Sequence, residues 1–308
     1  MKNMRIPLCI ALGVAIIGIV LGSFLDLQIS TAIASANNGF GLLVSAIGPT
    51  IGFGAVAAMG GGFIAFIIKG KYHIALKIMF GVLAAACFGV AIRYPAGSWF
   101  GINGFNNIGV PEEVGYLVVL LPESAAAVGG YFLFKDCKNQ NMWIVFCIII
   151  AVLLTALLAV IPTLKDNIHR PRYRLISTTD AVAFHNWWEP CNEYKQLIES
   201  IPTKGDNFKS YPSGHTAEIS ILFVAVTFLP LADNKYKKYQ MPLFYITCGL
   251  VLLVAFARIL AAAHFLSDVS TGATIMLALL IIANEIIMRI KPLQIEEQQA
   301  EVEQKAAQ

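Results

Sequence analysis

The sequence predicts an all-α fold: a polytopic membrane helix bundle with about eight transmembrane helices. Apolar residues make up 57% of the chain and charged residues only 13%, whereas soluble domains carry about 25% charged residues. Uncharged stretches of about 20 residues recur along the chain, and this length lets a helix cross the hydrocarbon core of a bilayer. Short segments with lysine or arginine separate these stretches, as is typical of cytoplasmic loops.

The charge balance and the cysteines exclude several classes of function. The net charge is only +3, without a basic or acidic block, which gives no support for a nucleic-acid partner. The six cysteines have no CxxC spacing, and most lie in apolar stretches, so we expect neither a disulfide framework nor a metal site. These cysteines are Cys9, Cys87, Cys137, Cys147, Cys191 and Cys248.

The first apolar stretch follows Lys2 and Arg5 and runs without a charge from Ile6 to Leu25. A signal peptide is the alternative interpretation, because Ala34-Ser-Ala36 resembles a cleavage site. The stretch is long for a signal peptide, and we therefore expect an uncleaved first span.

Seven further spans are expected along the chain. The first part of the uncharged segment 27–68, around Asn37 and Asn38, is typical of a re-entrant or interfacial piece. The second span is rich in glycine, which allows close helix packing. Pro162 is expected to end the fifth span, and a long polar loop at 163–211 follows it. Spans two to eight are predicted at 47–68, 74–92, 115–134, 143–161, 212–231, 241–257 and 265–288.

The order of the basic residues predicts the orientation in the membrane. With eight spans, the short basic connections all fall on one side, which the positive-inside rule assigns to the cytoplasm. Both termini are then cytoplasmic, and the loop 163–211 lies on the outer face with the start of span six. We expect an integral protein of a bacterial plasma (inner) membrane. The connections contain Lys2 and Arg5, Lys69 and Lys71, Lys135 and Lys138, Lys235, Lys237 and Lys238, and Arg289 and Lys291.

The segment from Lys165 to Arg174 follows the fifth span and holds a lysine and three arginines beside Asp166. One interpretation is that these side chains reach lipid headgroups. The other is a phosphate clamp, in which arginine forks and a lysine point charge bind oxygen atoms. Because positive charge on the outer side opposes the orientation rule, we favour the clamp.

The sixth span opens with Tyr211-Pro-Ser-Gly-His-Thr216. A helix N-terminus offers free N–H groups and a favourable dipole to an anion. Ser213 adds a hydroxyl donor, Gly214 allows close approach of the backbone, and His215 can give a proton to a leaving oxygen. The alternative is an ordinary serine cap with a nearby histidine. Glu218, one turn after His215, is a candidate to tune it.

The turn between the last two spans carries Arg258, His264 and Asp268. His264 and Asp268 are four residues apart and share one face if they lie on a helix. A carboxylate in this position can hold the imidazole in one tautomer and stabilise its cation. The alternative is that both side chains merely cap the start of a helix.

The three segments occur in the order Lys165-x6-Arg172, Pro-Ser-Gly-His at 212–215 and Arg258-x5-His264-x3-Asp268. Together they resemble the three-part signature of the type 2 phosphatidic acid phosphatase family, lipid phosphate phosphatases related to vanadium haloperoxidases. The resemblance covers about residues 143–290. Two positions depart from the family pattern, because Tyr173 replaces a proline and Ala257 replaces a serine.

The resemblance implies a mechanism that needs no metal or other cofactor. His264 would attack phosphorus and form a phosphohistidine, Asp268 would orient and stabilise it, and His215 would protonate the leaving group. The phosphate oxygens, where transition-state charge is greatest, would be held by cations and hydrogen-bond donors. This phosphate-binding set comprises Lys165, Arg172, Ser213, Gly214 and Arg258.

We therefore predict a membrane phosphatase whose partner is a lipid-linked phosphate or diphosphate, with the active site at the extracytoplasmic face. Undecaprenyl diphosphate, phosphatidic acid and phosphatidylglycerol phosphate are equal candidates. The alternatives are a lipid phosphotransferase that uses the same histidine, and a transporter, although a transporter should place its charges near the bilayer midplane. The expected organisation is a membrane scaffold of about four spans at 1–142, a phosphatase core at 143–290 and a polar cytoplasmic tail at 291–308.

Overall fold

A computed structural model describes residues 4–100, 111, 113–137, 139 and 141–290 of the chain, and all regular structure in this part is helical. Eight helical segments are long and apolar enough to span a membrane, which confirms the predicted fold class and makes the chain an integral membrane protein. The spans are formed by α1 (Arg5–Ile33), α2 (Gly39–Lys69), α3 (Ile74–Phe100), α4 (Val114–Phe134), α5 with its continuation α6 (Met142–Leu154 and Ile161–Ile168), α9 with α10 (Gly214–Ser220 and Leu222–Phe228), α11 (Gln240–Leu260) and α12 (Leu266–Ile287).

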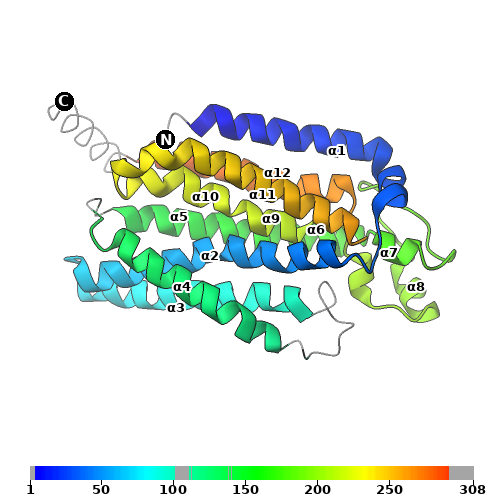
Figure 1. Ribbon diagram of the computed structural model, residues 1–308, viewed down its shortest axis with the longest axis horizontal. Coiled ribbons are helices and arrows are strands. Elements are labelled where there is room, and N and C mark those ends of the chain that lie inside the picture. The colour runs from blue at the N-terminus through cyan, green and yellow to red at the C-terminus, as the bar shows by residue number, and fades with distance from the viewer. Residues whose placement is uncertain (1–3, 101–110, 112, 138, 140, 291–308) are drawn as a thin grey trace.

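The long helices lie side by side, with α1 along α12 and with α3 and α4 against α2 (Figure 1). The start of α1 and the end of α12 meet at one end of the bundle, where Arg5 and Glu285 form an ion pair of 3.0 Å. The short elements gather at the opposite end: α6, α7 (Tyr173–Ile176), α8 (Tyr194–Ser200) and the 3-10 turn η4 (Gly205–Phe208). The bundle therefore has two different ends, one of which holds the polar segment 163–211.

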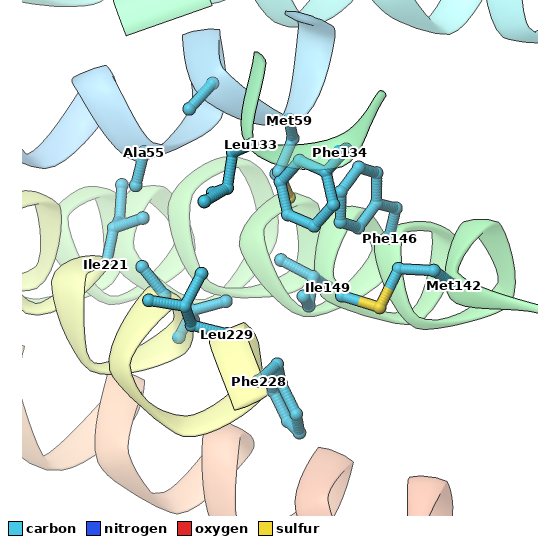
Figure 2. Close-up of a pocket in the computed structure, with 13 residues that line it drawn as sticks. Ala55, Met59, Leu133, Phe134, Met142, Phe146, Ile149, Ile221, Phe228 and Leu229 are labelled. Carbon is cyan, nitrogen blue, oxygen red and sulfur yellow. The ribbon is translucent and has the colours of Figure 1, made fainter. Parts of the chain in front are cut away.

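Aromatic side chains fill the centre of the bundle between α2, α3, α4 and α5. Phe63, Phe66, Phe134 and Phe146 pack with ring centroids between 4.9 and 6.4 Å apart. Beside them lies a cavity of about 80 Å³ whose lining is entirely apolar (Figure 2). Such a lining offers no group that could bind a phosphate, so the chemistry must lie elsewhere.

Three expectations about helix limits are wrong. Residues 27–33 belong to α1 and α2 begins at Gly39, so the expected re-entrant piece is replaced by a short link at residues 34–38. The side chain of Asn38 caps α2 by accepting a hydrogen bond of 2.7 Å from the Gly41 N–H, which is why the link is so short. Likewise, α3 continues past Arg93 to Phe100.

The third difference concerns Pro162, which does not end the fifth span. The helical path continues from α5 through a π-helical turn, η3 (Thr155–Val160), into α6. Pro162 lies in the first turn of α6, where a missing N–H is tolerated. The path ends at His169, whose backbone is left-handed with a φ of 48°. Lys165 therefore lies on a helix and not in the loop. The predicted tail 291–308 lies outside the described residues.

The glycines of α2 allow close packing, as predicted. A Cβ atom added at Gly61 would lie 1.8 Å from the carbonyl oxygen of Ala127 on α4, and one at Gly130 of α4 would lie 2.0 Å from the carbonyl oxygen of Ala58 on α2. These two contacts bring the α2 and α4 backbones together in a way that no larger residue allows. Gly129, the neighbour of Gly130, has nothing within 4 Å of its Cβ position.

The adjacent glycines of α4 give a matched test of this packing. We expect Gly130→Ala to lower the free energy of unfolding by about 1–3 kcal/mol, because the methyl group forces α2 and α4 apart. Gly129→Ala should be neutral or slightly stabilising, since alanine favours a helix by about 1 kcal/mol over glycine. Thermal unfolding in detergent measures both variants. Equal effects of the two substitutions would contradict the close contact.

Candidate active site

The predicted site residues come together at the end of the bundle that holds α6, α7 and α8. They arrive from four parts of the chain: α6 and the segment after it, the start of α9, the end of α11, and the turn that leads into α12. The charged members lie within electrostatic range of one another. The set consists of Lys165, Arg172, Ser213, Gly214, His215, Arg258, His264 and Asp268.

The contacts of His264 fix its tautomer. Its Nδ1 atom lies 2.6 Å from the carbonyl oxygen of Ser210, which only accepts hydrogen bonds, so Nδ1 carries the proton. Its Nε2 atom lies 3.3 Å from Nη1 of Arg172, which only donates. Both contacts require the same neutral tautomer, in which the Nε2 lone pair accepts the hydrogen bond from Arg172. Such an imidazole is poised to act as a nucleophile.

The end of α11 places His264 in this position. The N–H groups of Ala263 and His264 both donate to the carbonyl oxygen of Arg258, each at 3.2 Å. Ala262 adopts a φ of 54°, the left-handed conformation that commonly ends a helix. The chain therefore turns sharply between α11 and α12, and this turn carries His264 into the interior, where its side chain is 1% exposed.

The surroundings of His264 favour its neutral form. Burial lowers the pKa of His264 well below its usual value of 6.5, and the positive charges of Arg172, Arg258 and Lys165 lower it further. Hydrogen bonding to the Ser210 carbonyl acts in the opposite direction but is a smaller effect. A neutral imidazole at neutral pH is what a nucleophilic role requires.

Asp268 lies near His264 but makes its closest contacts elsewhere. Its carboxylate accepts hydrogen bonds from Nη1 of Arg170 at 2.6 Å, from the Phe265 N–H at 2.8 Å and from the Ser210 hydroxyl. The distance from Asp268 Oδ2 to His264 Nδ1 is 3.8 Å. Direct orientation of the imidazole thus falls to the Ser210 carbonyl, while Asp268 supplies negative charge beneath the ring. The predicted role of Asp268 in catalysis remains a prediction.

Arg170 is a central residue that the sequence did not single out. Its guanidinium is fully buried and contacts Asp268, the Ser267 hydroxyl at 2.8 Å and Asp26 of α1 at 2.9 Å, and its Nε donates to the His185 carbonyl at 2.8 Å. The Phe265 ring lies against it at 4.3 Å. The first span was expected to serve only as scaffold, although Asp26 is the only charged residue between Arg5 and Lys69. An acid in an apolar span is a signal of function.

Arg172 is held by a second residue that sequence reasoning missed, Asp206 of η4. Nη2 of Arg172 forms an ion pair of 3.0 Å with the Asp206 carboxylate, and Nε donates to the Asp206 carbonyl at 2.9 Å. Arg174 contacts the same carboxylate at 3.2 Å. Burial alone would raise the pKa of Asp206, but Arg172, Lys165 and Arg174 together hold it below its usual range. Asp206 therefore stays ionised and orients the clamp arginine.

The remaining cations are concentrated around the same point. Nζ of Lys165 donates to the Lys209 carbonyl at 2.8 Å, which uses one of its three protons. Arg258 is fully buried and within electrostatic range of Arg172 and Arg174. Gathering like charges away from water is unfavourable unless an anion joins them. The cluster therefore fits a ligand that carries negative charge.

The start of α9 faces this cluster. Ser213 is the N-cap of α9, and its hydroxyl accepts hydrogen bonds from Thr216. His215 follows in the first turn, and its Nε2 is buried with no hydrogen-bond partner among the described residues. On its other side, His215 Nδ1 lies 4.0 Å from the Glu218 carboxylate. His215 thus presents an unused ring nitrogen to the place where an anion would bind.

One group of side chains in the described part of the chain has the geometry of a possible metal site. Ligand atoms of His185, Cys191 and Glu193 lie within 4.8 Å of one another, although their spacing in the sequence gave no sign of it. Burial raises the pKa of the Cys191 thiol to about 11, and a metal would have to bind the thiolate. We therefore assign no role to this group.

Comparison with known proteins agrees with this geometry. The sequence pattern of the PAP2 superfamily matches residues 140–291, a segment that contains all of the predicted site residues. This protein carries a PAP2 superfamily domain. No curated protein and no solved structure matches the chain. The PAP2 domain begins just before α5, so α1 to α4 lie outside it.

The neutral state of buried His264 predicts how stability depends on pH. As pH falls below 6.5, the unfolded chain takes up a proton on His264 but the folded protein does not, so stability decreases. This one group contributes a slope of up to about 1.4 kcal/mol per pH unit. His264→Asn keeps a donor for the Ser210 carbonyl but cannot titrate, so its unfolding free energy should fall less between pH 7.5 and 5.5.

Denaturant unfolding in detergent at several pH values measures this difference. His73→Asn, at an exposed position, is the matched control and should follow the wild-type curve. Parallel curves for wild type and His264→Asn would contradict the neutral, buried imidazole.

Proposed function

We propose that this protein is a metal-independent lipid phosphatase that hydrolyses a lipid-linked phosphate or diphosphate through a phosphohistidine. Members of the PAP2 superfamily are generally metal-independent phosphatases. In this proposal, residues 143–290 form the phosphatase core and residues 1–142 the membrane scaffold. Undecaprenyl diphosphate, phosphatidic acid and phosphatidylglycerol phosphate all fit the charge and the membrane setting of the site.

One observation carries the proposal: the Nε2 lone pair of His264 faces the Arg172 guanidinium at 3.3 Å, inside a buried cluster of cations. A neutral nucleophile beside fixed positive charges suits attack on phosphorus, because the charge on the phosphate oxygens grows in the transition state. A bound phosphate would draw the Arg172 donors to its own oxygens and so free this lone pair for attack.

The proposed reaction proceeds in two steps. Nε2 of His264 forms a bond to phosphorus as the bond from phosphorus to the leaving oxygen breaks, and that oxygen takes a proton from His215. Water then attacks phosphorus as the bond from phosphorus to Nε2 of His264 breaks, one proton of the water passes to His215, and inorganic phosphate leaves. Nε2 of His215, which has no hydrogen-bond partner in the described part of the chain, is suited to this exchange.

The phosphate oxygens would meet donors from three directions. Arg172 and Lys165 lie on the side of α6, Arg258 comes from the end of α11, and the N-terminus of α9 offers Ser213 and the Gly214 N–H. The positive end of the α9 dipole adds to the attraction for an anion. This arrangement neutralises an anion with side chains and backbone, and so supports chemistry without a metal.

We also propose that the active site faces the outside of the cell. The basic residues of the short connections, such as Lys69, Lys135 and Lys237, lie at helix ends distant from the site, and basic connections stay in the cytoplasm. A phosphatase with this topology would act on lipids in the outer leaflet. The acyl or prenyl tail would remain in the bilayer while the head group enters the cation cluster.

Phosphate release by the purified protein tests the activity. In detergent with EDTA present, we expect release from one class of lipid phosphate or diphosphate and at least a 1,000-fold loss in His264→Ala, as for removal of other covalent nucleophiles. Unchanged thermal unfolding of the variant serves as the control. Full activity of His264→Ala would rule out the nucleophile. No release by the wild type, but transfer to an added acceptor lipid, would instead identify a phosphotransferase.

Chemical labelling of intact cells tests the topology. A cysteine introduced at the exposed Glu199 of α8 should react with a membrane-impermeant maleimide from outside. A cysteine at the exposed Lys237, near the opposite end, should react only after the cells are permeabilised. The reverse pattern would overturn the proposed orientation but would leave the proposed phosphatase reaction unaffected.

A further inference from the structure

Asp26 lies outside the PAP2 domain, yet its carboxylate is buried beneath the site. It is carried by α1, which lies along α12 (Figure 1). Two glycines bring the helices together, since an added Cβ at Gly22 would lie 2.6 Å from the Ser267 nitrogen and one at Gly18 would lie 2.3 Å from the Ser270 hydroxyl. Asp26 is one turn beyond Gly22, and so reaches the first turn of α12.

Every contact of the Asp26 carboxylate is with a hydrogen-bond donor. Oδ1 accepts from the Ser267 N–H at 2.9 Å, and Oδ2 accepts from Nη2 of Arg170 at 2.9 Å and from the Ser267 hydroxyl. The side chain is 2% exposed. The Arg170 guanidinium and the Ser267 N–H can only donate, one to each carboxylate oxygen, and the Arg170 contact is also an ion pair, whereas the Ser267 hydroxyl can donate or accept. The surroundings of Asp26 are therefore built for the charged form.

The charges beneath His264 do not cancel. Arg170 contributes one positive charge and lies between two carboxylates, Asp26 and Asp268, so the group carries one net negative charge. Asp268 is the member nearest to the imidazole, with Oδ2 at 3.8 Å from Nδ1. When Nε2 of His264 bonds to phosphorus, its ring gains positive charge. The net negative charge of the Asp26, Arg170 and Asp268 group then attracts the positively charged ring, whereas the neutral ring gave it no such attraction.

We infer that Asp26 is a positioning residue for the proposed reaction, on which this role rests. It acts through Arg170: by offsetting the guanidinium charge, it leaves the negative charge of Asp268 available to the phosphorylated imidazole. Without Asp26, Arg170 and Asp268 would form a neutral pair, and the developing positive charge would find no compensation. The first helix thus completes the active site from outside the PAP2 domain.

The first test is Asp26→Asn, assayed on the lipid that the wild type hydrolyses. We expect kcat to fall about 10- to 100-fold, the scale of one charge interaction in a buried site, while KM changes less than about threefold. KM should hold because the phosphate-binding cations are untouched. Ser30→Ala, one turn further along α1 and also buried, is the matched control and should keep the wild-type kcat.

Charge compensation separates this role from a structural one. Arg170→Gln alone leaves two carboxylates, but the double variant Asp26→Asn with Arg170→Gln restores one net negative charge next to His264. We expect the double variant to be more active than Asp26→Asn, whereas two purely structural defects would add. If Asp26→Asn fails to fold, Arg170→Gln is compared with the double variant: once the guanidinium is gone, Asp26 has no charge to offset, so its removal should lower kcat less than about tenfold.

The outcomes distinguish this role from the proposed function. A wild-type kcat in Asp26→Asn, or a double variant less active than Asp26→Asn at unchanged thermal stability, would overturn the role of Asp26 alone. A wild type that releases no phosphate from any lipid would overturn the proposed function, and the role of Asp26 with it.

Discussion

The end of the bundle that holds the candidate site depends on one buried guanidinium, that of Arg170. Arg170 joins α1 through Asp26, α12 through Ser267 and Asp268, and the loop before α8 through the His185 carbonyl. These partners lie up to 144 residues from Arg170 in the sequence. A fully buried arginine without such partners would be strongly destabilising. Satisfying its donors therefore fixes the relative positions of the segments from which the site is built.

His264 lies between two regions of opposite charge. Asp268, which pairs with Arg170, lies near Nδ1, and the Arg172 guanidinium lies at Nε2 together with the other cations of the cluster. The Ser210 carbonyl and the Arg172 guanidinium hold the ring in one tautomer between them. Because these groups are already oriented in the unliganded protein, the proposed reaction would need little reorganisation as charge develops, which is the main source of catalytic power in many enzymes.

Much of the site could be predicted from the sequence because its residues lie in local patterns. Ser213 and His215 share the first turn of a helix, and Arg258 and His264 bracket one turn between spans. Asp206 and Ser210 could not be found in this way, since no spacing relates them to Arg172 or His264 and only the folded loop brings them near. Asp26 was different: an acid at the end of an apolar span is visible in the sequence, but its partner Arg170 is not.

The number of spans could be predicted from local sequence, but the residues at which several helices begin or end could not. Hydropathy located eight spans, because the bilayer imposes a length on each helix. It misplaced the ends at Gly39, Phe100 and Ile168, since caps and first-turn prolines decide them and polar residues can continue a helix beyond the membrane core. The consequence for function is direct, because the extension after Pro162 carries Lys165.

The π-helical turn between α5 and α6 makes the direction of Lys165 depend on a single residue. A π turn holds one residue more than an α-helical turn, and one residue corresponds to about 100° of rotation around the helix axis. Before this turn, α5 directs Val145, Phe146 and Ile149 into the apolar core. After it, the same continuous helix presents a lysine to the anion site. A related protein that lost one residue of this turn would have almost the same length, hydropathy and motifs. Its counterpart of Lys165, however, would be rotated by about 100° around the helix axis, away from the candidate site.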